Sequence, residues 1–490
     1  MKKLLLTILF LVCAVLVAWQ VNEVLKFKHT DGNLILEAFY SNKKPIDVLM
    51  LGSSHTYDHL NAGIMWRSEG VSAFALAAGS QRYWSSYYYL KESLKYLKPQ
   101  VLIFDVGGGA RYSGRHSDST ITIWSTLGLR SYIDKARSIA LSVPSIDRRV
   151  SIFLGIPEYH SRYRELKEDD FPFLTSKEIS SVVFGRIHTN IYKNNIQDMS
   201  SIQDMKALDE KDEEFFLKIL DLAKQNDIKV LLVKSPYQLP PEHQKIYNYI
   251  DNIAKAHGVE FLNFNLSYKD VGIDPLYDFR DFSHFNVHGI KKYSMYLAKY
   301  LRENYNVPDR RNDPEYAEWD KWANDYYMLA FTPKLNTTLQ EYLKLLKNYS
   351  NDVVVFTVVT DEASRQIGKI SQEELSILGI DADLKGKHQY GYVSVYDTET
   401  GFDYEEISEN QTIIFKDRRD KLPMGVDVKS RGGRDLNKNE NTISSIKING
   451  QEHSKNKRGL NIVIYDKKRK TVIDSFYVDT HGDPTFTIKR

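Results

Sequence analysis

The chain has 490 residues, more than one hydrophobic core can serve, so two or three folded units are expected. Its 66 basic and 64 acidic residues leave a net charge of +2, which gives no reason to expect nucleic acid as a partner. The 32 Tyr and 22 Phe are typical both of sugar-stacking surfaces and of large cores. These numbers indicate a globular and mainly soluble protein.

The first residues form a charged and then apolar segment. Lys2 and Lys3 precede an apolar run, Leu4–Trp19, which only Thr7 interrupts. A positive flank before a hydrophobic stretch is the pattern of an export signal or a signal anchor. No small-residue cleavage site follows, so we expect residues 1–24 to stay as a single-pass anchor in the cell membrane, with the rest of the chain outside the cytoplasm.

Cysteine usage indicates a bacterial setting. The one cysteine of the chain, Cys13, lies inside the apolar run. The exported part therefore has no disulfide, which favours a bacterial cell surface over a eukaryotic secretory pathway.

After the anchor, short runs rich in branched apolar residues alternate with longer amphipathic stretches. This alternation is typical of parallel strands joined by helices. The predicted strands are Ile46–Leu51, Val71–Ala77, Val101–Val106, Ile228–Val233 and Val259–Phe264. The predicted helices, which carry apolar residues at helical spacing, are Tyr83–Leu97, Glu210–Gln225, Pro241–Ala256 and Val287–Leu301. We therefore expect a three-layer α/β/α domain with a parallel sheet over residues 25–326.

Two further segments belong to this domain. Residues 111–209 are rich in Tyr, Arg and His, and they predict an insertion over the carboxyl edge of the sheet, where open α/β folds bind their ligands. Asn306–Asp320, with two prolines and mixed charges, predicts the end of the domain and a linker.

A candidate nucleophile follows the first predicted strand. That strand runs into Gly52-Ser53-Ser54-His55 and then into a helix. A serine at a strand-to-helix turn has an exposed hydroxyl, and backbone N–H groups nearby can bind an oxyanion. The tetrapeptide alone is weak evidence, because Gly and Ser are common in turns.

A second element, far along the chain, completes a catalytic pattern. Asp281 and His284 lie three residues apart, before the last predicted helix of the domain. In a Ser-His-Asp mechanism the histidine takes the serine proton and the carboxylate fixes the histidine tautomer. The competing interpretation is that Asp281 merely caps the following helix. With Ser54 after the first strand, we favour the triad Ser54, His284 and Asp281.

These residues resemble the SGNH (GDSL-like) hydrolase superfamily, whose members have a flavodoxin-like α/β/α fold. Gly52-Ser53-Ser54 is similar to its first block, Ala78-Gly79-Ser80 to its second, and Asp281 with His284 to its last. The resemblance covers roughly residues 45 to 305 and implies that Ser54 is the nucleophile. It also implies that the N–H groups of Ser54 and Gly79 form the oxyanion hole.

The third block departs from the family pattern. After VLIFDV come Gly107-Gly108-Gly109, with no asparagine to donate to the oxyanion, so we expect a glycine N–H of this loop, Gly107, to substitute. This departure resembles the branch with the D-alanyl-transfer protein of teichoic-acid synthesis and the anchored acetyltransferases of exopolysaccharide assembly. The motifs G-S-S-H, A-G-S-Q and K-P-x-V-L-I-F-D-V resemble those of a membrane-anchored bacterial group of this kind, whose substrates are generally surface glycans.

Other polar residues lie near the predicted site. Asp105 and His55 are the predicted substrate-binding residues, although Asp105, at the end of the third strand, could equally bind a local backbone turn. The pairs His55/His59 and His284/His288 have a spacing of four, which could hold a metal on one helical face. No H-E-x-x-H is present, so metal catalysis is the less favoured alternative. We expect neither a metal nor a cofactor.

From about Tyr327 the pattern changes, which predicts a separate mixed α/β, β-rich domain over residues 327–490. It begins with a helix, Leu339–Leu346, and a strand, Val353–Val359, and its last strands are Leu460–Tyr465 and Val472–Val478. Lys429–Asn441, rich in Lys and Asn, predicts a mobile loop.

This second domain resembles the interleukin-like EMT inducer family. The similar words are Ser445–Gly450, Arg458–Tyr465 and Asp474–Asp479, and then Val353–Ser364 and Leu375–Gly379, which in the family come in the opposite order. That order predicts a circular permutation, which costs little when the termini of a domain lie close together. The resemblance implies a carbohydrate-binding module, and a structural appendage is the alternative.

The sequence therefore predicts a membrane-anchored serine esterase or O-acyltransferase that acts on a cell-surface polysaccharide through an acyl-Ser54 intermediate, with acetyl as the expected acyl group. The expected partners are the membrane, a surface glycan or its acylated form, and, as a further candidate, a membrane protein that donates the acyl group. The alternative is a catalytically silent glycan-binding or assembly protein, which the missing third-block asparagine favours.

Overall fold

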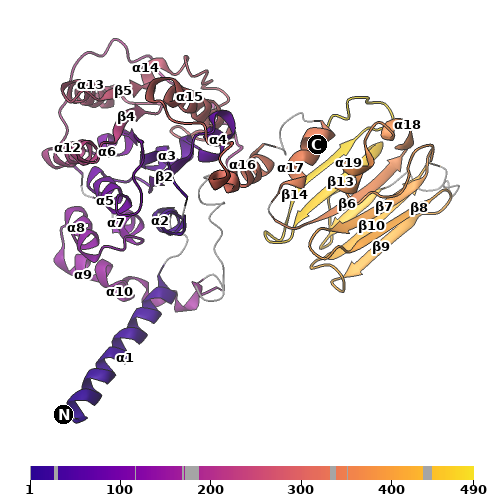
Figure 1. Cartoon of the computed structure of the whole chain (residues 1–490), viewed down its shortest axis with the longest axis horizontal. Helices are drawn as coiled ribbons and strands as arrows, with labels where there is room; N and C mark the ends of the chain where they lie inside the picture. The colour runs from indigo at the N-terminus through magenta and orange to yellow at the C-terminus, as the bar shows by residue number, and fades with distance from the viewer. Residues whose placement is uncertain are drawn as a thin grey trace. The chain divides into compact units, whose positions relative to one another are not determined.

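The structure is a computed structural model of the full chain. It describes residues 2–26, 31–42, 44–115, 117, 119–167, 170–171, 187–331, 338–349, 351–433 and 444–490. The chain divides into two compact units, Met1–Ala323 and Asn324–Arg490 (Figure 1). The sequence placed this boundary after residue 326.

Unit 1 is built on a parallel sheet of five strands in the order β2-β1-β3-β4-β5. The strands are β1 (Val48–Gly52), β2 (Ala73–Ala77), β3 (Val101–Asp105), β4 (Lys229–Lys234) and β5 (Glu260–Asn263). Every residue of β1, β2 and β3 is buried, because helices cover both faces of a parallel sheet. The predicted fold class, an α/β sheet with flanking helices, is confirmed.

Helices on the two faces of the sheet pack in pairs, α4 with α15 and α5 with α12. The helices around the sheet are α3 (Ser54–His59), α4 (Ala62–Glu69), α5 (Tyr83–Ser93), α12 (Glu210–Gln225), α13 (Pro241–Ala256), α14 (Phe264–Ser267) and α15 (Val287–Tyr305). Helix α12 begins where predicted because Asp209 caps it, accepting from the Lys211 N–H. These helices hold the carboxyl ends of β1 and β3, where the chain turns toward the candidate site.

The predicted insertion starts with short helices, and its described residues 187–209 form no helix or strand. Its helices are α6 (Gly107–Arg111), α7 (Ser119–Thr126), α8 (Tyr132–Ser142), α9 (Ile146–Leu154), α10 (Ile156–Tyr159) and the 3-10 turn η1 (His160–Arg164). Residues 172–186 of the insertion lie outside the described residues. The part that follows, from 187, runs beside the segment that carries Asp281 and His284.

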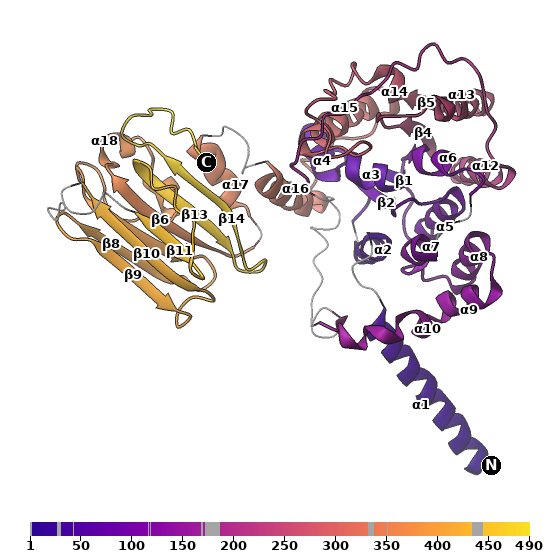
Figure 2. The same cartoon turned by 180° about the vertical axis from the view of Figure 1, so that it is seen from behind.

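The N-terminal run forms one long helix, α1 (Lys2–Leu25), followed by α2 (Asp31–Ser41). The most apolar 18-residue stretch within Lys3–Leu25 has a mean hydropathy of 2.7 and is exposed. Among the described residues, α1 is the one helix long and apolar enough to cross a membrane. Figure 2 shows α1 projecting from the edge of unit 1 that carries α9 and α10.

All of the predicted linker, Asn306–Asp320, belongs to unit 1. Val307 is buried, Arg310 holds Asp47 with two bonds of 2.9 Å, and Trp319 stacks on Trp66 at 5.5 Å between ring centroids. The segment includes the turn η3 (Pro314–Tyr316) and the start of α16 (Ala317–Ala330). The prediction of a linker was wrong here, because prolines and charges also suit a surface segment that packs through a few large side chains.

Unit 2 has a mixed sheet of nine strands with helices against it. The strands are β6 (Val353–Asp361), β7 (Gly391–Asp397), β8 (Asp403–Ser408), β9 (Ile413–Arg418), β10 (Gly425–Gly432), β11 (Ser445–Ile448), β12 (Gln451–Glu452), β13 (Gly459–Asp466) and β14 (Thr471–Val478). The helices are α17 (Leu339–Lys347), α18 (Ser364–Ile367) and α19 (Gln372–Ser376). Buried residues lie on both faces of β6 and form two hydrophobic clusters.

Two sequence predictions concern the loops and ends of unit 2. The predicted loop Lys429–Asn441 is wrong at its start, because residues up to Gly432 pair with β9 and β6 in strand β10; positions 434–441 lie outside the described residues. The start and end of the unit meet, since the Leu339 N–H donates to the Phe486 carbonyl at 2.9 Å. That proximity is what a permutation requires, and the permutation itself stays a prediction.

Candidate active site

The candidate nucleophile lies at the turn between β1 and α3. Gly52 has φ +150°, and a Cβ there would lie 2.3 Å from the Thr56 Oγ1, so only glycine fits. Of the two serines that follow, Ser53 is buried, with 2 % of its surface exposed, whereas Ser54 is only half-buried. The hydroxyl that a substrate can reach is therefore that of Ser54.

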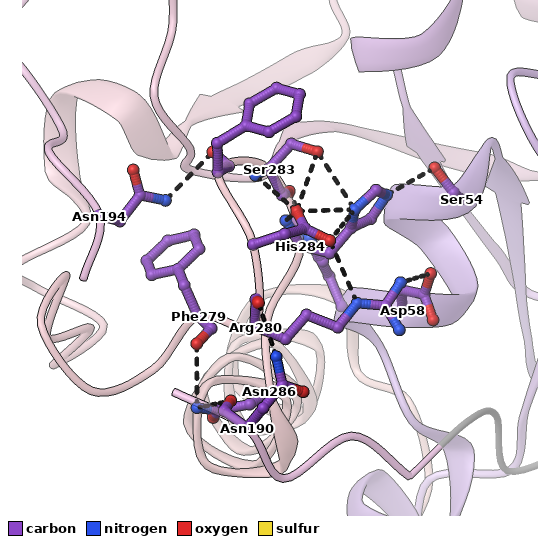
Figure 3. Close-up of polar contacts among 12 residues, drawn as sticks. Ser54, Asp58, Asn190, Asn194, Phe279, Arg280, Ser283, His284 and Asn286 are labelled. Atoms are coloured by element: carbon purple, nitrogen blue, oxygen red, sulfur yellow. Dashed lines mark hydrogen bonds and ion pairs between the residues drawn. The ribbon is translucent and has the colours of Figure 1, made fainter. Parts of the chain in front are cut away.

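Ser54, His284 and Asp281 form a continuous chain of hydrogen bonds (Figure 3). His284 Nε2 lies 3.0 Å from Ser54 Oγ, although 230 positions separate the two residues. On the other side of the ring, His284 Nδ1 lies 3.0 Å and 3.1 Å from the two carboxylate oxygens of Asp281. This arrangement keeps the proton of the neutral ring on Nδ1, so that Nε2 is free to accept the serine proton.

The Asp281 carboxylate is held by its own turn. Its Oδ1 accepts the backbone N–H groups of Ser283 at 2.8 Å and His284 at 2.9 Å. Burial raises the pKa of Asp281, but the hydrogen bond from His284 and those from the backbone outweigh burial, and the pKa lies well below its usual range. Asp281 therefore stays ionised and can stabilise an imidazolium.

Asp281 does not cap the following helix. Asn286 caps α15 instead, because its Oδ1 accepts from the N–H groups of His288 and Gly289. Its amide donates to the Tyr277 carbonyl at 2.6 Å, which fixes the chain on both sides of the cap. The carboxylate of Asp281 is left to serve His284.

Two residues of α3 brace the Asp281–His284 segment. The Nε2 of His59 lies 3.0 Å from the carbonyl oxygen of Ser283 and must donate to it. Burial and nearby positive charges lower the pKa of His59 well below its usual value, so this ring is neutral. Asp58 binds Arg280 at 2.7 Å in a largely buried ion pair (Figure 3).

The insertion braces the same segment from the other side. Asn190 donates to the Arg280 carbonyl at 2.8 Å, and Asn194 donates to the Phe282 carbonyl at 3.1 Å (Figure 3). Tyr192 and Phe279 form an antiparallel bridge. The position of His284 therefore depends on α3 and on the end of the insertion together.

Two backbone N–H groups are available beside Ser54. Within the described part of the chain, the N–H groups of Ser54 and Gly79 donate to no protein acceptor. Both lie at carboxyl ends of neighbouring strands, β1 and β2. The predicted third donor, Gly107, is different: its N–H donates to Asp105 Oδ1 at 2.8 Å, so the expectation that it binds the oxyanion was wrong.

The predicted substrate-binding residues Asp105 and His55 lie beneath the site. Asp105 is buried and accepts from Ser235 Oγ at 2.7 Å as well as from Gly107, which is the second of its two predicted roles. His55 is buried between the rings of His59 and Tyr237, each at 4.8 Å. The sequence placed both residues at the correct end of a strand, but side-chain packing turns them inward.

A buried lysine completes this lower layer. Lys234 donates to Asn265 Oδ1 at 2.8 Å and lies 3.7 Å from the centroid of the Tyr237 ring. Burial lowers the pKa of Lys234 to about 7, although Asp105 opposes this shift. Burial also raises the pKa of Asp105, against the effects of Lys234 and its hydrogen bonds.

The rim above the triad is cationic and aromatic. The Arg111 guanidinium lies 5.5 Å from the ring centroids of Tyr112 and Phe282 and 6.0 Å from that of Tyr237. Among the described residues, no carboxylate pairs with Arg111. Phe282 stands between Asp281 and His284 in sequence and is 45 % exposed, so this rim borders the triad.

The histidine pairs do not make a metal site of the predicted kind. His284 precedes α15, which begins at Val287, so His284 and His288 do not share a helical face. His55 and His59 are stacked on α3, but the His59 Nε2 is occupied by the Ser283 carbonyl. No group of three or more His, Cys, Asp and Glu that could hold a metal occurs in the described ranges.

Sequence reasoning missed the supporting residues of the site. His59 entered only as half of a metal pair, while Arg280, Asn194 and Lys234 were not singled out. An Arg directly before Asp281 was a usable signal, since a charged residue next to a carboxylate often orients it. Lys234, at the end of an apolar strand, was another.

Comparisons with known proteins do not identify a family for this chain. No protein-family model matches the chain, and no curated protein matches it. Among solved structures, it is similar to a protein from Bacteroides fragilis described as a "putative acylhydrolase", with 12 % sequence identity and a TM-score of 0.28. That match covers 55 % of this chain and 94 % of the other.

Proposed function

We propose that the chain is a serine esterase or O-acyltransferase of the SGNH type, anchored in a membrane, which acts on an acylated surface glycan. The observation that carries this proposal is the hydrogen-bonded series from Ser54 Oγ through both ring nitrogens of His284 to Asp281, at 3.0 Å on each side of the ring. A reachable hydroxyl, a correctly oriented base and an ionised carboxylate are the components of nucleophilic acyl transfer.

In the first step Ser54 Oγ attacks the carbonyl carbon of an ester while His284 Nε2 takes the hydroxyl proton. Negative charge develops on the carbonyl oxygen, and the unpaired N–H groups of Ser54 and Gly79 are suited to receive it. Asp281 stabilises the imidazolium. The tetrahedral intermediate collapses as His284 returns the proton to the leaving alcohol, which leaves an acyl-Ser54 ester.

In the second step an acceptor hydroxyl attacks acyl-Ser54, and His284 again takes and returns the proton. Water as the acceptor gives hydrolysis, whereas a sugar hydroxyl gives transfer. The same three residues serve both outcomes, so the choice depends on which acceptor the rim holds.

The rim supports a glycan as the acyl donor or acceptor. Phe282, which is 45 % exposed, offers a ring of the kind on which sugars stack, and Arg111 offers a guanidinium that no described carboxylate neutralises. The apolar helix α1 supports an attachment to the membrane next to envelope polymers. The resemblance of unit 2 to a carbohydrate-binding family supports the same class of substrate.

A catalytically silent binding protein is the second candidate. The oxyanion donors favour it. The Gly107 N–H donates to Asp105, so of the three predicted donors only the N–H groups of Ser54 and Gly79 are left to bind an oxyanion. Losing one such donor costs on the order of 3 kcal/mol in enzymes that have been measured.

The deciding experiment measures release of p-nitrophenol from p-nitrophenyl acetate by the full chain in detergent. We expect turnover by the wild type, and a loss of at least about a thousandfold in Ser54→Ala. Ser53→Ala is the matched control: it removes a neighbouring hydroxyl that is buried, and it should keep turnover within about threefold of wild type.

The outcomes separate the candidates. Equal rates in wild type and Ser54→Ala would reject the enzyme and support the silent binder. Turnover that falls with chelator and survives Ser54→Ala would support a metal-dependent hydrolase instead. Mass spectrometry after incubation with a fluorophosphonate adds an independent readout, since an active Ser54 should gain the phosphonyl group.

A further inference from the structure

An apolar surface of unit 1 lies beside helix α1 and is not covered by protein in the described residues. Six large apolar side chains of α8 and α9 belong to it. They are Tyr132 at 67 %, Ile133 at 66 %, Ile146 at 71 %, Val150 at 52 %, Phe153 at 37 % and Leu154 at 55 % exposure. This amount of exposed apolar surface marks an interaction site in a soluble domain.

Helix α9 is amphipathic, and its apolar face is the exposed one. Ile146, Val150 and the pair Phe153 and Leu154 recur every three or four residues, which places them on one side of the helix. The residue of α9 that is buried in the protein is Ile152. A helix that turns its apolar face outward needs an apolar partner.

This surface is fixed to the end of α1. A Cβ on Gly155 would lie 2.3 Å from the Asn22 Oδ1, so α1 and the start of α10 are in close contact. Arg162 donates to the carbonyl of Leu25, the last residue of α1, at 2.6 Å, and to that of Lys26, the residue after it, at 2.7 Å. Leu25 itself is part of a small core with residues of α7 to α10. These contacts fix the position of α9 along the axis of α1.

The walls of a cavity of about 960 Å³ show which part of α1 lies beside α9. Its walls include Val15 and Trp19 of α1 together with Phe153 and Leu154 of α9. The apolar side chains of α9 thus lie level with residues well inside the hydrophobic part of α1. From Trp19 to Leu25 the helix rises about 9 Å, which is within the depth that interfacial amphipathic helices reach in a bilayer.

The charges near this surface suit a lipid headgroup region. Residues 130–149 contain five basic and two acidic side chains. Lys135, Arg130 and Lys26, the residue after α1, also line the cavity, together with Glu23 and Glu37. Basic residues next to a membrane span attract anionic lipids.

We propose that α9, the first turn of α8 and the cavity beside α1 form a membrane-embedded collar, with the phospholipids of the bilayer covering the apolar face and filling the cavity. The collar rests on the proposed crossing of the membrane by α1. It holds unit 1 at one height and one orientation on the bilayer, in addition to tethering it.

The collar is tested with the full chain reconstituted in phosphatidylcholine–phosphatidylglycerol vesicles. One fluorescent NBD label is attached by maleimide, first at the native Cys13 and then at Leu154→Cys in a Cys13→Ser background. Met295→Cys in the same background is the matched control, because Met295 is also an exposed apolar residue and lies on α15, at the far end of unit 1 from α1 in both views (Figures 1 and 2). Emission wavelength and quenching by brominated phospholipid are measured.

We expect the label at position 154 to emit at shorter wavelength and to be quenched by lipid at least about threefold more than the label at 295. If lipid quenches the label at position 13 while the label at position 154 emits as in water, the collar is rejected and the anchor is retained. Absence of quenching at 13 would instead overturn the anchor on which the collar depends, and the collar with it. Lipid quenching at both 154 and 295 would show that the label itself partitions, and the collar would then fail.

Discussion

The Nε2 of His59 lies 3.0 Å from the carbonyl oxygen of Ser283, the residue directly before His284. Both partners are buried, and the Phe285 ring packs against the His59 ring in a tilted arrangement, at 4.2 Å between centroids. His59 thus acts as a positioning residue: it touches no reacting atom, and it holds the backbone from which His284 reaches Ser54.

This contact predicts that His59→Phe lowers the kcat for p-nitrophenyl acetate by about 10- to 100-fold, because a buried carbonyl loses its donor. His59→Gln keeps an N–H donor and should recover most of the loss. KM should change little in either variant. A wild-type kcat in His59→Phe would contradict the positioning role, and equal melting temperatures of the two variants would separate it from a general loss of stability.

The close packing of the glycine turn predicts a second effect. A Cβ on Gly108 would lie 2.5 Å from the Ser53 Cβ, so Gly108→Ala must displace the residue before Ser54. We expect a loss of about 1–3 kcal/mol in stability and a matching fall in melting temperature and in turnover.

Gly425→Ala is the matched control for that substitution. Gly425 begins β10 of unit 2, and its added methyl group would meet the Asn449 Oδ1 at 3.8 Å, an ordinary contact. Turnover within about threefold of wild type is expected. An equal loss of turnover in Gly425→Ala would show that the packing argument is wrong.

The buried Lys234 predicts a pH dependence of stability. Its folded pKa of about 7 is below that of an unfolded lysine, so above pH 7 the unfolded chain binds the extra proton. The free energy of unfolding should therefore rise between pH 7 and 10, by at most about 1.4 kcal/mol per pH unit from this group.

Lys234→Met removes that contribution, and its melting temperature should rise less over the same range. The measurement is the difference in melting temperature between wild type and Lys234→Met at pH 7 and pH 9. If the melting temperature of the wild type does not rise relative to that of Lys234→Met between pH 7 and pH 9, the pKa of Lys234 is not depressed.

The rim predicts a change in substrate preference. Arg111→Gln removes a guanidinium that lies over Phe282, and it should raise KM for an acidic acylated glycan by about tenfold, more than it raises KM for p-nitrophenyl acetate. Kinetics on the two substrates, with Arg111→Lys for comparison, test this. The same factor for both substrates would assign Arg111 a structural role.

Apart from the partly exposed edge strand β5, the strands of unit 1 are buried over all or most of their length, which made the sheet predictable. Such strands appear in the sequence as continuous apolar runs, so every predicted strand lies within two residues of the observed one. Helices α12 and α13 have the predicted bounds, since Asp209 before the first and Pro240 before the second mark their starts.

What the sequence did not show depends on contacts between distant residues. His59 acts on a carbonyl 224 positions away, and no local pattern marks such a pair. The inward direction of Asp105 follows from Ser235 and Gly107, which compete with substrate for its oxygens. The segment at Trp319 has the composition of a linker, and its packing becomes visible only beside Trp66.

Strand β6 occupies the middle of the unit 2 sheet, yet its antiparallel neighbour β13 comes from the far end of the chain. Strands β6 and β13 therefore cannot pair until nearly all of the chain has been synthesised. Contacts of such long sequence separation form slowly. Under the membrane anchoring proposed above, such a delay would keep unit 2 unfolded while it is carried across the membrane through a secretory channel.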